Sequence, residues 1–218
     1  MEDVIDRTND GLFSHALGGI ALALPLWAFV FRGRRGNFWM RMAFGAGSLG
    51  LYSLRARPEL RRQLPGQNDL MAGILSAAGL YSVFQIGDRL ARRIMPRGEQ
   101  DIASVYAFRT MANKAVIATL LVGIIAPSEE LFWRGLVQEA FMRRFERERG
   151  TALAATAYGG VHLVTGNLTL TAAAGVAGAY WGAEYAVQPR LGPLLVSHIL
   201  WDLWIFLIAP TPGGRKDR

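Results

Sequence analysis

The chain has 218 residues, of which 51% are hydrophobic and 19% are charged, and its mean hydropathy is +0.20. This composition excludes most classes of water-soluble enzyme. The net charge of +7 would fit nucleic-acid binding in a soluble protein, but the arginines lie in short clusters between apolar segments, where membrane proteins contact lipid headgroups. We therefore expect the lipid bilayer as a partner, and no nucleic acid.

Six apolar segments predict membrane spans. A helix needs about 20 mostly apolar residues to cross about 30 Å of hydrocarbon. No Asp, Glu, Lys or Arg interrupts residues 12–31, 70–87 or 150–183. The sequence therefore predicts an all-α fold, a polytopic membrane helix bundle with about six to eight transmembrane helices. The predicted spans are, in chain order, residues 12–31, 70–88, 115–142, 151–166, 170–187 and 191–209.

Three segments need a separate interpretation. Residues 38–54 are short and carry Arg41, so this segment either crosses the membrane with Arg41 reaching the interface or lies partly among the headgroups. Residues 97–114 mix charged and apolar side chains, which favours an interfacial helix. The span at 170–187 is rich in Ala and Gly, so we expect it to pack closely against its neighbours at the centre of the bundle.

Ionisable side chains lie inside three of the predicted spans. Such groups are costly in a bilayer unless they are paired or hydrated, so they are candidates for function. The third span contributes two carboxylates and an arginine, the fourth a histidine, and the last a histidine and an aspartate. These candidates are Glu129, Glu130, Arg134, His162, His198 and Asp202.

An up-and-down path of helices brings these candidates to similar depths. If the third span runs toward the loop at 143–149, the next span and the last one both begin on that side. At 1.5 Å per residue, Glu129 and His162 lie about 18–20 Å from that face, and His198 lies about 12 Å from it. This predicts one convergent polar site that opens toward the face with the loops at 143–149 and 188–190.

Helical spacing separates the roles of the two adjacent carboxylates. Glu130 and Arg134 are four residues apart, so they share a helical face and neutralise each other, which is also what a purely structural ion pair would do. Glu129 points about 100° away and has no local partner, which leaves it free to act as a general base toward water. Pro127 removes a backbone hydrogen bond beside them and can kink the helix.

Two mechanisms are open for the histidines. Asp202 follows His198 by four residues and can orient it, bind a metal with it, or face the substrate. A Zn²⁺ site would use His162, His198 and a carboxylate, for which we expect Glu129, because two histidines and an acid suit catalytic zinc. In the metal-free alternative, Glu129 activates water directly and a histidine donates a hydrogen bond to the oxyanion. The absence of cysteine excludes thiolate ligands and thiol catalysis.

The order of these motifs resembles the CPBP family of intramembrane proteases, which includes the type II CAAX prenyl endopeptidases and the bacteriocin-processing or abortive-infection (ABI) proteins. The resemblance implies a helical membrane bundle that hydrolyses a peptide bond in a membrane-associated protein or peptide, in the inner membrane of a bacterial or archaeal cell. It also implies a single membrane domain over residues 1–218, with a catalytic core at about 110–210 and accessory helices at 1–109. The motifs are Glu129-Glu130-x-x-x-Arg134, Tyr158-x-x-x-His162 and His198-x-x-x-Asp202.

The same resemblance implies a role for each site residue. Glu129 would activate the water, and Glu130 would pair with Arg134 to hold the site. His162 and His198 would bind a metal or polarise the scissile carbonyl. Family members are commonly called metalloproteases, although a metal-free glutamate mechanism has been argued for the prenyl endopeptidases, so both alternatives stay open.

The sequence departs from the family pattern at two positions. Tyr158 stands where phenylalanine is usual, which is a mild change. Asp202 stands where the prenyl endopeptidases carry asparagine. Because a carboxylate cannot donate the amide hydrogen bond, a ligand role or a His198-orienting role is favoured over an oxyanion role, and a prenylated substrate is less expected.

Two other functions of different classes remain to be weighed. A non-proteolytic scaffold or bacteriocin self-immunity protein could share the fold, but the intact motifs favour a protease. A small proton-coupled transporter could use the same buried groups, but no inverted repeat is visible. Outside the motifs, we expect His15 to be interfacial and Glu184 to reach water. We expect the tryptophans to serve as interface anchors or in packing.

Overall fold

The computed structural model describes residues 2–33, 37–63 and 65–209, and over these residues every regular element is helical. This confirms the predicted all-α fold. Short 3₁₀ and π segments join or extend several helices. The α-helices are α1 (Glu2–Arg32), α2 (Phe38–Ala56), α3 (Gln67–Ile94), α4 (Gly98–Ala107), α5 (Lys114–Leu120), α6 (Ala126–Phe132), α7 (Glu139–Phe145), α8 (Arg147–Val161), α9 (Leu168–Val187) and α10 (Leu191–Leu203).

Four helical segments in the described part of the chain are long and apolar enough to cross a membrane. They are Asn9–Arg32, Gln67–Ile94, Lys114–Phe145 and Leu191–Ile208, and each coincides with a predicted span. By contrast, α8 has only 15 residues, which is about 22 Å of helix and shorter than the hydrocarbon layer. The predicted number of six to eight crossings therefore stays a prediction.

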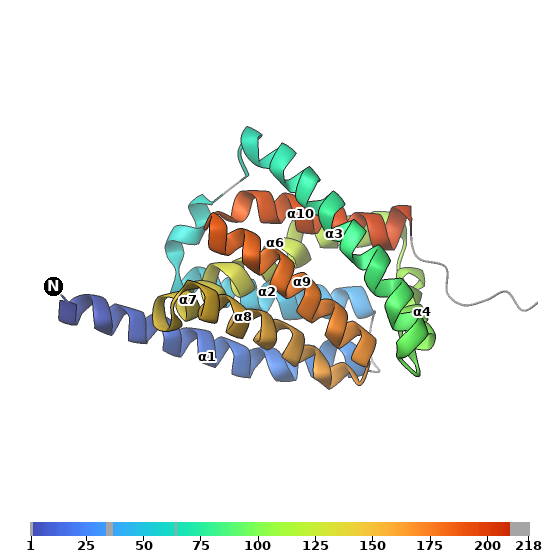
Figure 1. Ribbon diagram of the computed structural model, residues 1–218, viewed down its shortest axis with the longest axis horizontal. Coiled ribbons are helices and arrows are strands. Elements are labelled where there is room, and N and C mark those ends of the chain that lie inside the picture. The colour runs from blue at the N-terminus through green and yellow to red at the C-terminus, as the bar shows by residue number, and fades with distance from the viewer. Residues whose placement is uncertain (1, 34–36, 64, 210–218) are drawn as a thin grey trace, which may run out of the picture.

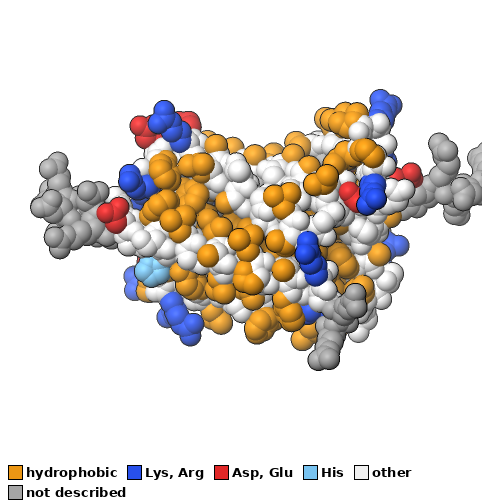
Figure 2. Space-filling view, turned by 90° about the horizontal axis from the view of Figure 1, so that it is seen from below, with side chains coloured by type: hydrophobic (Ala, Val, Ile, Leu, Met, Phe, Trp, Pro, Cys, Tyr) orange, Lys and Arg blue, Asp and Glu red, His pale blue; other side chains and the backbone are white. Residues whose placement is uncertain are grey.

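The surface of the bundle is typical of an integral membrane protein. Large apolar side chains are exposed along α3, where Met71, Leu75, Ile86 and Ile94 are each 62–67% exposed. Figure 2 shows hydrophobic side chains spread over the middle of one face, whereas most charged side chains lie toward its two ends. Soluble proteins rarely expose apolar surface on this scale, but a lipid-facing surface requires it.

Helix α2 is a packed member of the bundle and lies against α1 and α6. Gly50 makes the contact with α6 possible, because a Cβ atom there would lie 2.7 Å from the Ser128 Oγ atom. Arg41 is 9% exposed, and its Nε donates to the carbonyl of Val30 in α1 at 3.1 Å. Arg41 thus lies against the end of a neighbouring helix.

Helix α9 lies at the side of the bundle and not at its centre, which corrects the prediction for 170–187. One face packs closely on α8, where a Cβ atom on Gly159 would lie 3.0 Å from the Gly175 Cα atom. The opposite face is exposed, with Val176 at 44%. Figure 1 shows α9 beside α8 on the outside of the bundle, with α3 crossing α10 and ending at α4. Small residues therefore let α9 approach α8 closely, and Gly182 also lies against Gln138, whose Oε1 atom would be 3.3 Å from a Cβ atom there.

Helix α4 occupies part of the segment predicted as interfacial. It packs on α3 and α9, and Asp101 links it to the first turn of α9. The Thr169 hydroxyl donates to Asp101 Oδ2 at 3.0 Å, and the side-chain amide of Asn167 donates to the Asp101 carbonyl at 2.9 Å. The end of α3, α4 and the start of α9 thus lie together at one end of the molecule.

Candidate active site

The two adjacent glutamates lie on a helix with an irregular backbone on both sides. A π-helical turn, Leu121–Ile125, precedes α6, and a second one, Trp133–Gln138, follows it. Pro127 lies in the first turn of α6 and has no N–H to donate to the preceding turn. The irregularity predicted at Pro127 therefore takes the form of a π-helical turn, a feature that is frequent at functional sites.

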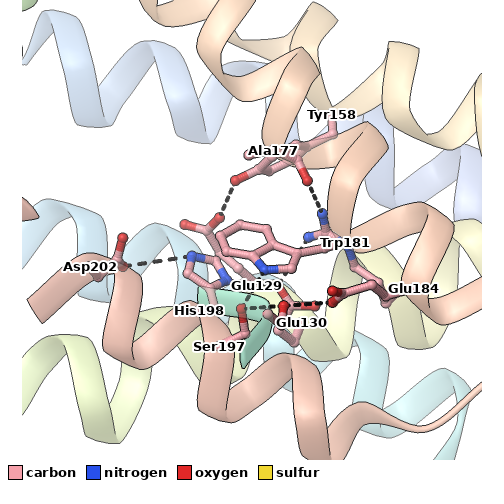
Figure 3. A network of polar contacts seen from close by, with 11 residues as sticks. Glu129, Glu130, Tyr158, Ala177, Trp181, Glu184, Ser197, His198 and Asp202 are labelled. Carbon is pink, nitrogen blue, oxygen red and sulfur yellow. Dashed lines mark hydrogen bonds and ion pairs between the residues drawn. The ribbon is translucent and has the colours of Figure 1, made fainter. Parts of the chain in front are cut away.

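Glu130 is at the centre of the polar network in Figure 3. Its Oε1 atom accepts from Arg134 Nη1 at 3.0 Å, as the spacing predicts, and also lies 2.7 Å from His198 Nδ1 on α10. Glu130 is fully buried and the Arg134 side chain is 2% exposed. One carboxylate therefore joins the third predicted span to the last one.

Aromatic rings enclose the guanidinium of Arg134. Its Cζ atom lies 5.1 Å from the centre of the Tyr158 ring and 5.3 Å from that of Trp181. Both distances are within the range of cation–π attraction. Arg134 Nη2 also donates to the carbonyl of Ala177 at 3.4 Å. The cation that balances Glu130 is thus held in one place by α8 and α9.

Glu129 is not paired with Arg134 on its own helix, as the spacing predicts, but it has a hydrogen-bond partner on α8. The Tyr158 hydroxyl donates to Glu129 Oε2 at 3.0 Å, and Glu129 is 5% exposed. The Tyr158 ring fits here because α9 carries Gly178, where a Cβ atom would lie only 2.8 Å from it. The departure from the usual phenylalanine therefore places a hydrogen-bond donor on the proposed base.

His198 lies between two carboxylates and against an indole ring. Its Nε2 atom is 3.6 Å from Asp202 Oδ2, on the side of the ring opposite Glu130. The imidazole stacks on Trp181, with ring centres 4.2 Å apart and planes 25° apart. Asp202 is therefore placed to orient His198, as its spacing suggested.

His162 has different surroundings, because it contacts no carboxylate in the described network. Its Nε2 atom accepts from Trp27 Nε1 of α1 at 3.1 Å, and its Nδ1 atom lies 2.8 Å from the Tyr158 carbonyl. An indole N–H can only donate, so Nε2 carries no proton and Nδ1 donates to the carbonyl. These two partners fix both the tautomer and the ring plane.

The predicted zinc ligands do not fit a metal site in this arrangement. Among the residues that the structure describes, no group of three or more His, Asp or Glu side chains is placed to hold a metal ion. The lone pair of His162 Nε2 is taken by Trp27, and both nitrogens of His198 face carboxylates. Zn²⁺ binding by His162, His198 and Glu129 would require these contacts to break.

A cavity of about 600 Å³ lies next to the site. His162, His198 and Asp202 form its polar wall, and apolar side chains of α3, α4 and α9 form much of the rest. It lies at the end where α3 finishes and α9 begins, opposite the loops at 143–149 and 188–190, so the predicted opening direction was wrong. The reason is that α8 ends at Val161. His162 is thus at the far end of its helix, and it lines the cavity from there.

Several contributors were not predicted from the sequence. Trp27 and Trp181 were expected only as anchors or in packing, yet their indole N–H groups donate to His162 and to Ser197. Little in the sequence indicated these roles, because each indole N–H is a single polar group within an apolar segment. Glu184 was expected to reach water, and it is partly exposed, but its Oε2 atom also accepts a hydrogen bond from Ser76 at 2.8 Å, which the sequence did not predict. His15 is exposed and bonds to the Gly11 carbonyl of its own helix.

Comparison with known proteins gives one family. The model of the family described as type II CAAX prenyl endopeptidase Rce1-like matches residues 112–204. No curated protein and no solved structure matches the chain. The matched segment contains all six predicted site residues and confirms the resemblance drawn from the three motifs, while Trp27 and Ser76 lie outside it.

Proposed function

We propose, from the match of residues 112–204 to the Rce1-like type II CAAX prenyl endopeptidases, that this protein is an intramembrane endopeptidase. Its substrate is a membrane-associated protein or peptide, and the membrane is the inner membrane of a bacterial or archaeal cell. One observation carries the proposal. The buried carboxylate of Glu129 is held by Tyr158 close to the His198–Asp202 pair, which lines a cavity.

Glu129 is the general base. Tyr158 holds Oε2, which leaves Oε1 to accept a proton from a water molecule as its oxygen attacks the scissile carbonyl. Arg134 and His198 both contact Glu130 through Oε1 and balance its charge, while Oε2 is buried without a hydrogen-bond partner among the described residues, so Glu130 is the less suitable of the two carboxylates to take that proton. When the C–N bond breaks, Glu129 returns the proton to the leaving amine. One water is consumed, and a carboxylic acid and an amine are formed.

His198 polarises the carbonyl and stabilises the oxyanion. It lines the cavity, and Glu130 holds its Nδ1 atom at 2.7 Å, whereas Nε2 lies 3.6 Å from Asp202 Oδ2, beyond hydrogen-bond distance, so the Nε2–H group can donate to the carbonyl oxygen. A donor that is held before the reaction stabilises developing negative charge without reorganising. Asp202 cannot donate to the oxyanion while it is ionised, so its role is to orient His198.

His162 orients the base through Tyr158. Its Nδ1–H donates to the Tyr158 carbonyl one helical turn back, and its ring lies edge-on to the Tyr158 ring with centres 5.3 Å apart. The phenol of the same tyrosine contacts Glu129. No step needs a metal, because this arrangement already supplies a base, an oxyanion donor and the groups that hold them.

The apolar cavity gives the substrate its place. Ligand sites are usually concave and mostly apolar, with a few convergent polar groups. Here His162, His198 and Asp202 supply polar groups of the site, Asp88 and Asp101 supply carboxylates elsewhere in the lining, and the apolar walls suit a segment that enters from the lipid or the interface. The family match supports a peptide as the substrate, since the family consists of endopeptidases.

Cleavage of a membrane-tethered peptide by the purified protein in detergent tests the proposal. We expect wild type to cleave, and Glu129→Ala and His162→Ala not to. The matched controls are Glu148→Ala and His15→Ala, because both residues are exposed and lie outside the site. Cleavage at the wild-type rate by Glu129→Ala would overturn the assignment of the base. A peptide that binds but is never cut would favour a scaffold.

A further inference from the structure

A chain of side-chain hydrogen bonds runs from Trp181 to Glu184 through two serines. Trp181 Nε1 donates to Ser197 Oγ at 2.9 Å, and Ser197 Oγ lies 2.8 Å from Ser76 Oγ. The Ser76 hydroxyl reaches Glu184 Oε2 at 2.8 Å. Figure 3 shows Trp181, Ser197 and Glu184 beside His198, and Ser76 joins this network from α3.

Elementary chemistry gives the chain one direction. An indole N–H can only donate and an ionised carboxylate can only accept, whereas a hydroxyl does both. Ser76 therefore donates to Glu184, so it must accept from Ser197, which in turn accepts from Trp181. Each hydroxyl proton has a single consistent position. Such a chain is stiffer than two serines whose protons are free to rotate.

The donor end of this hydrogen-bond chain is the Trp181 indole, which stacks against His198. Trp181 is 1% exposed, Ser197 is fully buried, and the indole and imidazole planes are only 25° apart. Ser197 is the residue before His198, so the Trp181 hydrogen bond and the stacking contact both act on the same turn of α10. Rotation of the His198 ring about its side-chain bond is therefore opposed by an indole that cannot itself turn.

We propose that Trp181 is a positioning residue for His198, and that Ser197, Ser76 and Glu184 hold its indole plane. This rests on the proposed function, since positioning matters through the reaction that His198 assists. Ser76 lies on α3, outside the segment that matches the protease family. Helix α3 therefore contributes to the geometry of the site as well as to the cavity wall.

Three variants remove the Trp181–Ser197 hydrogen bond while an aromatic ring still stacks against His198. Trp181→Phe keeps an aromatic face but removes the N–H, Ser197→Ala removes the acceptor, and the third variant combines both. A small loss of alignment lowers the turnover number, so we expect kcat to fall about tenfold in each single variant, with KM nearly unchanged. The double variant should be no slower than either single one, because all three break the same bond.

The matched control for the serines is Ser82→Ala. Ser82 is also on α3, but its hydroxyl bonds to the Ala78 carbonyl of its own helix. It should keep the wild-type kcat. Single variants with wild-type kcat, or losses that multiply in the double variant, would overturn the positioning role.

A second measurement does not depend on cleavage. The chain has three histidines, so ¹⁵N-histidine labelling gives few imidazole signals to assign. The signals of His198 should move in Trp181→Phe and in Ser197→Ala, while those of His162 stay in place. Unchanged His198 signals in both variants would overturn the proposal. A wild type that does not cleave would contradict the proposed function alone, and these signals would then decide the positioning role.

Discussion

The two buried histidines of the site have opposite surroundings. His198 is 4% exposed and its two ring nitrogens face the carboxylates of Glu130 and Asp202. His162 is 6% exposed, and its partners are the indole N–H of Trp27 and a main-chain carbonyl. The same side chain at the same burial is thus held among charges in one region and among neutral groups in the other.

This difference separates two tasks of the site. The charged region, made of Glu129, Glu130, Arg134, His198 and Asp202, lies wholly within the matched segment, and in the proposed mechanism it supplies the chemistry. The neutral region around His162 depends on α1, outside that segment, and supplies orientation. Helix α1, in the region predicted as accessory, therefore contacts one of the motif residues directly.

Removing the cation of the charged region should have the largest effect on stability. Arg134→Ala leaves Glu130 buried without its main counter-charge, and we expect the free energy of unfolding to fall by about 3–5 kcal/mol. Arg143→Ala is the matched control, because Arg143 makes the same i, i+4 pair with Glu139 while its side chain is 42% exposed. That change should cost about 0–1 kcal/mol. Equal losses in detergent unfolding experiments would contradict a distinct charged region.

Removing the contact between the regions should affect rate more than stability. Tyr158→Phe deletes the hydroxyl that donates to Glu129 and keeps the ring beside Arg134. We expect kcat to fall about tenfold while unfolding changes by about 1 kcal/mol. The measurement is single-turnover cleavage together with thermal unfolding. An unchanged rate would show that Glu129 is held by other groups.

Removing the indole N–H donor of Trp27 from the neutral region should have a smaller effect on the rate of cleavage. Trp27→Phe leaves His162 Nε2 without its donor. The Tyr158 carbonyl still keeps the proton on Nδ1, but the ring loses one of the two contacts that fix its plane, so we expect cleavage to fall severalfold. Trp39→Phe is the control, because Trp39 is equally buried but donates to the Phe108 carbonyl. Only the first substitution should change the ¹⁵N signals of His162. The same change in both variants would point to a general packing effect.

Metal removal should have the smallest effect of all. The nitrogens of both histidines are engaged by other partners, so activity should survive treatment with a zinc chelator. Elemental analysis of the purified protein should find no stoichiometric zinc. Loss of activity that added Zn²⁺ restores would show that the two regions rearrange around a metal.

Much of the fold follows from local pattern in the sequence. Apolar segments predict where helices lie, and four of them coincide with segments that are long and apolar enough to span a membrane. The direction in which the site opens was less predictable. His162 was placed about 18–20 Å from the face with the loops at 143–149 and 188–190, and it does lie at the far end of α8, but the cavity lies at that far end and not on the loop side where the opening was predicted. Helix length and tilt depend on neighbouring helices, which composition alone does not reveal.

The contacts of the site also differ in how far the sequence could predict them. The pair of Glu130 and Arg134 was predictable because its four-residue spacing is a property of one helix. The contact between Trp27 and His162 joins residues 135 positions apart. It depends on how α1 rotates against the end of α8, and no periodicity in either segment reports that rotation. Hydroxyl and indole groups also carry no charge, so they do not stand out in an apolar span.

The central claim is that Glu129 activates water to cleave a peptide bond. The most direct test compares wild type with Glu129→Gln on one membrane-tethered peptide in H₂¹⁸O, with the products analysed by mass spectrometry. We predict one ¹⁸O in the new carboxyl group from wild type and a rate about 10²–10⁴ lower in the variant. Cleavage by Glu129→Gln at the wild-type rate, or a product without ¹⁸O, would contradict the claim.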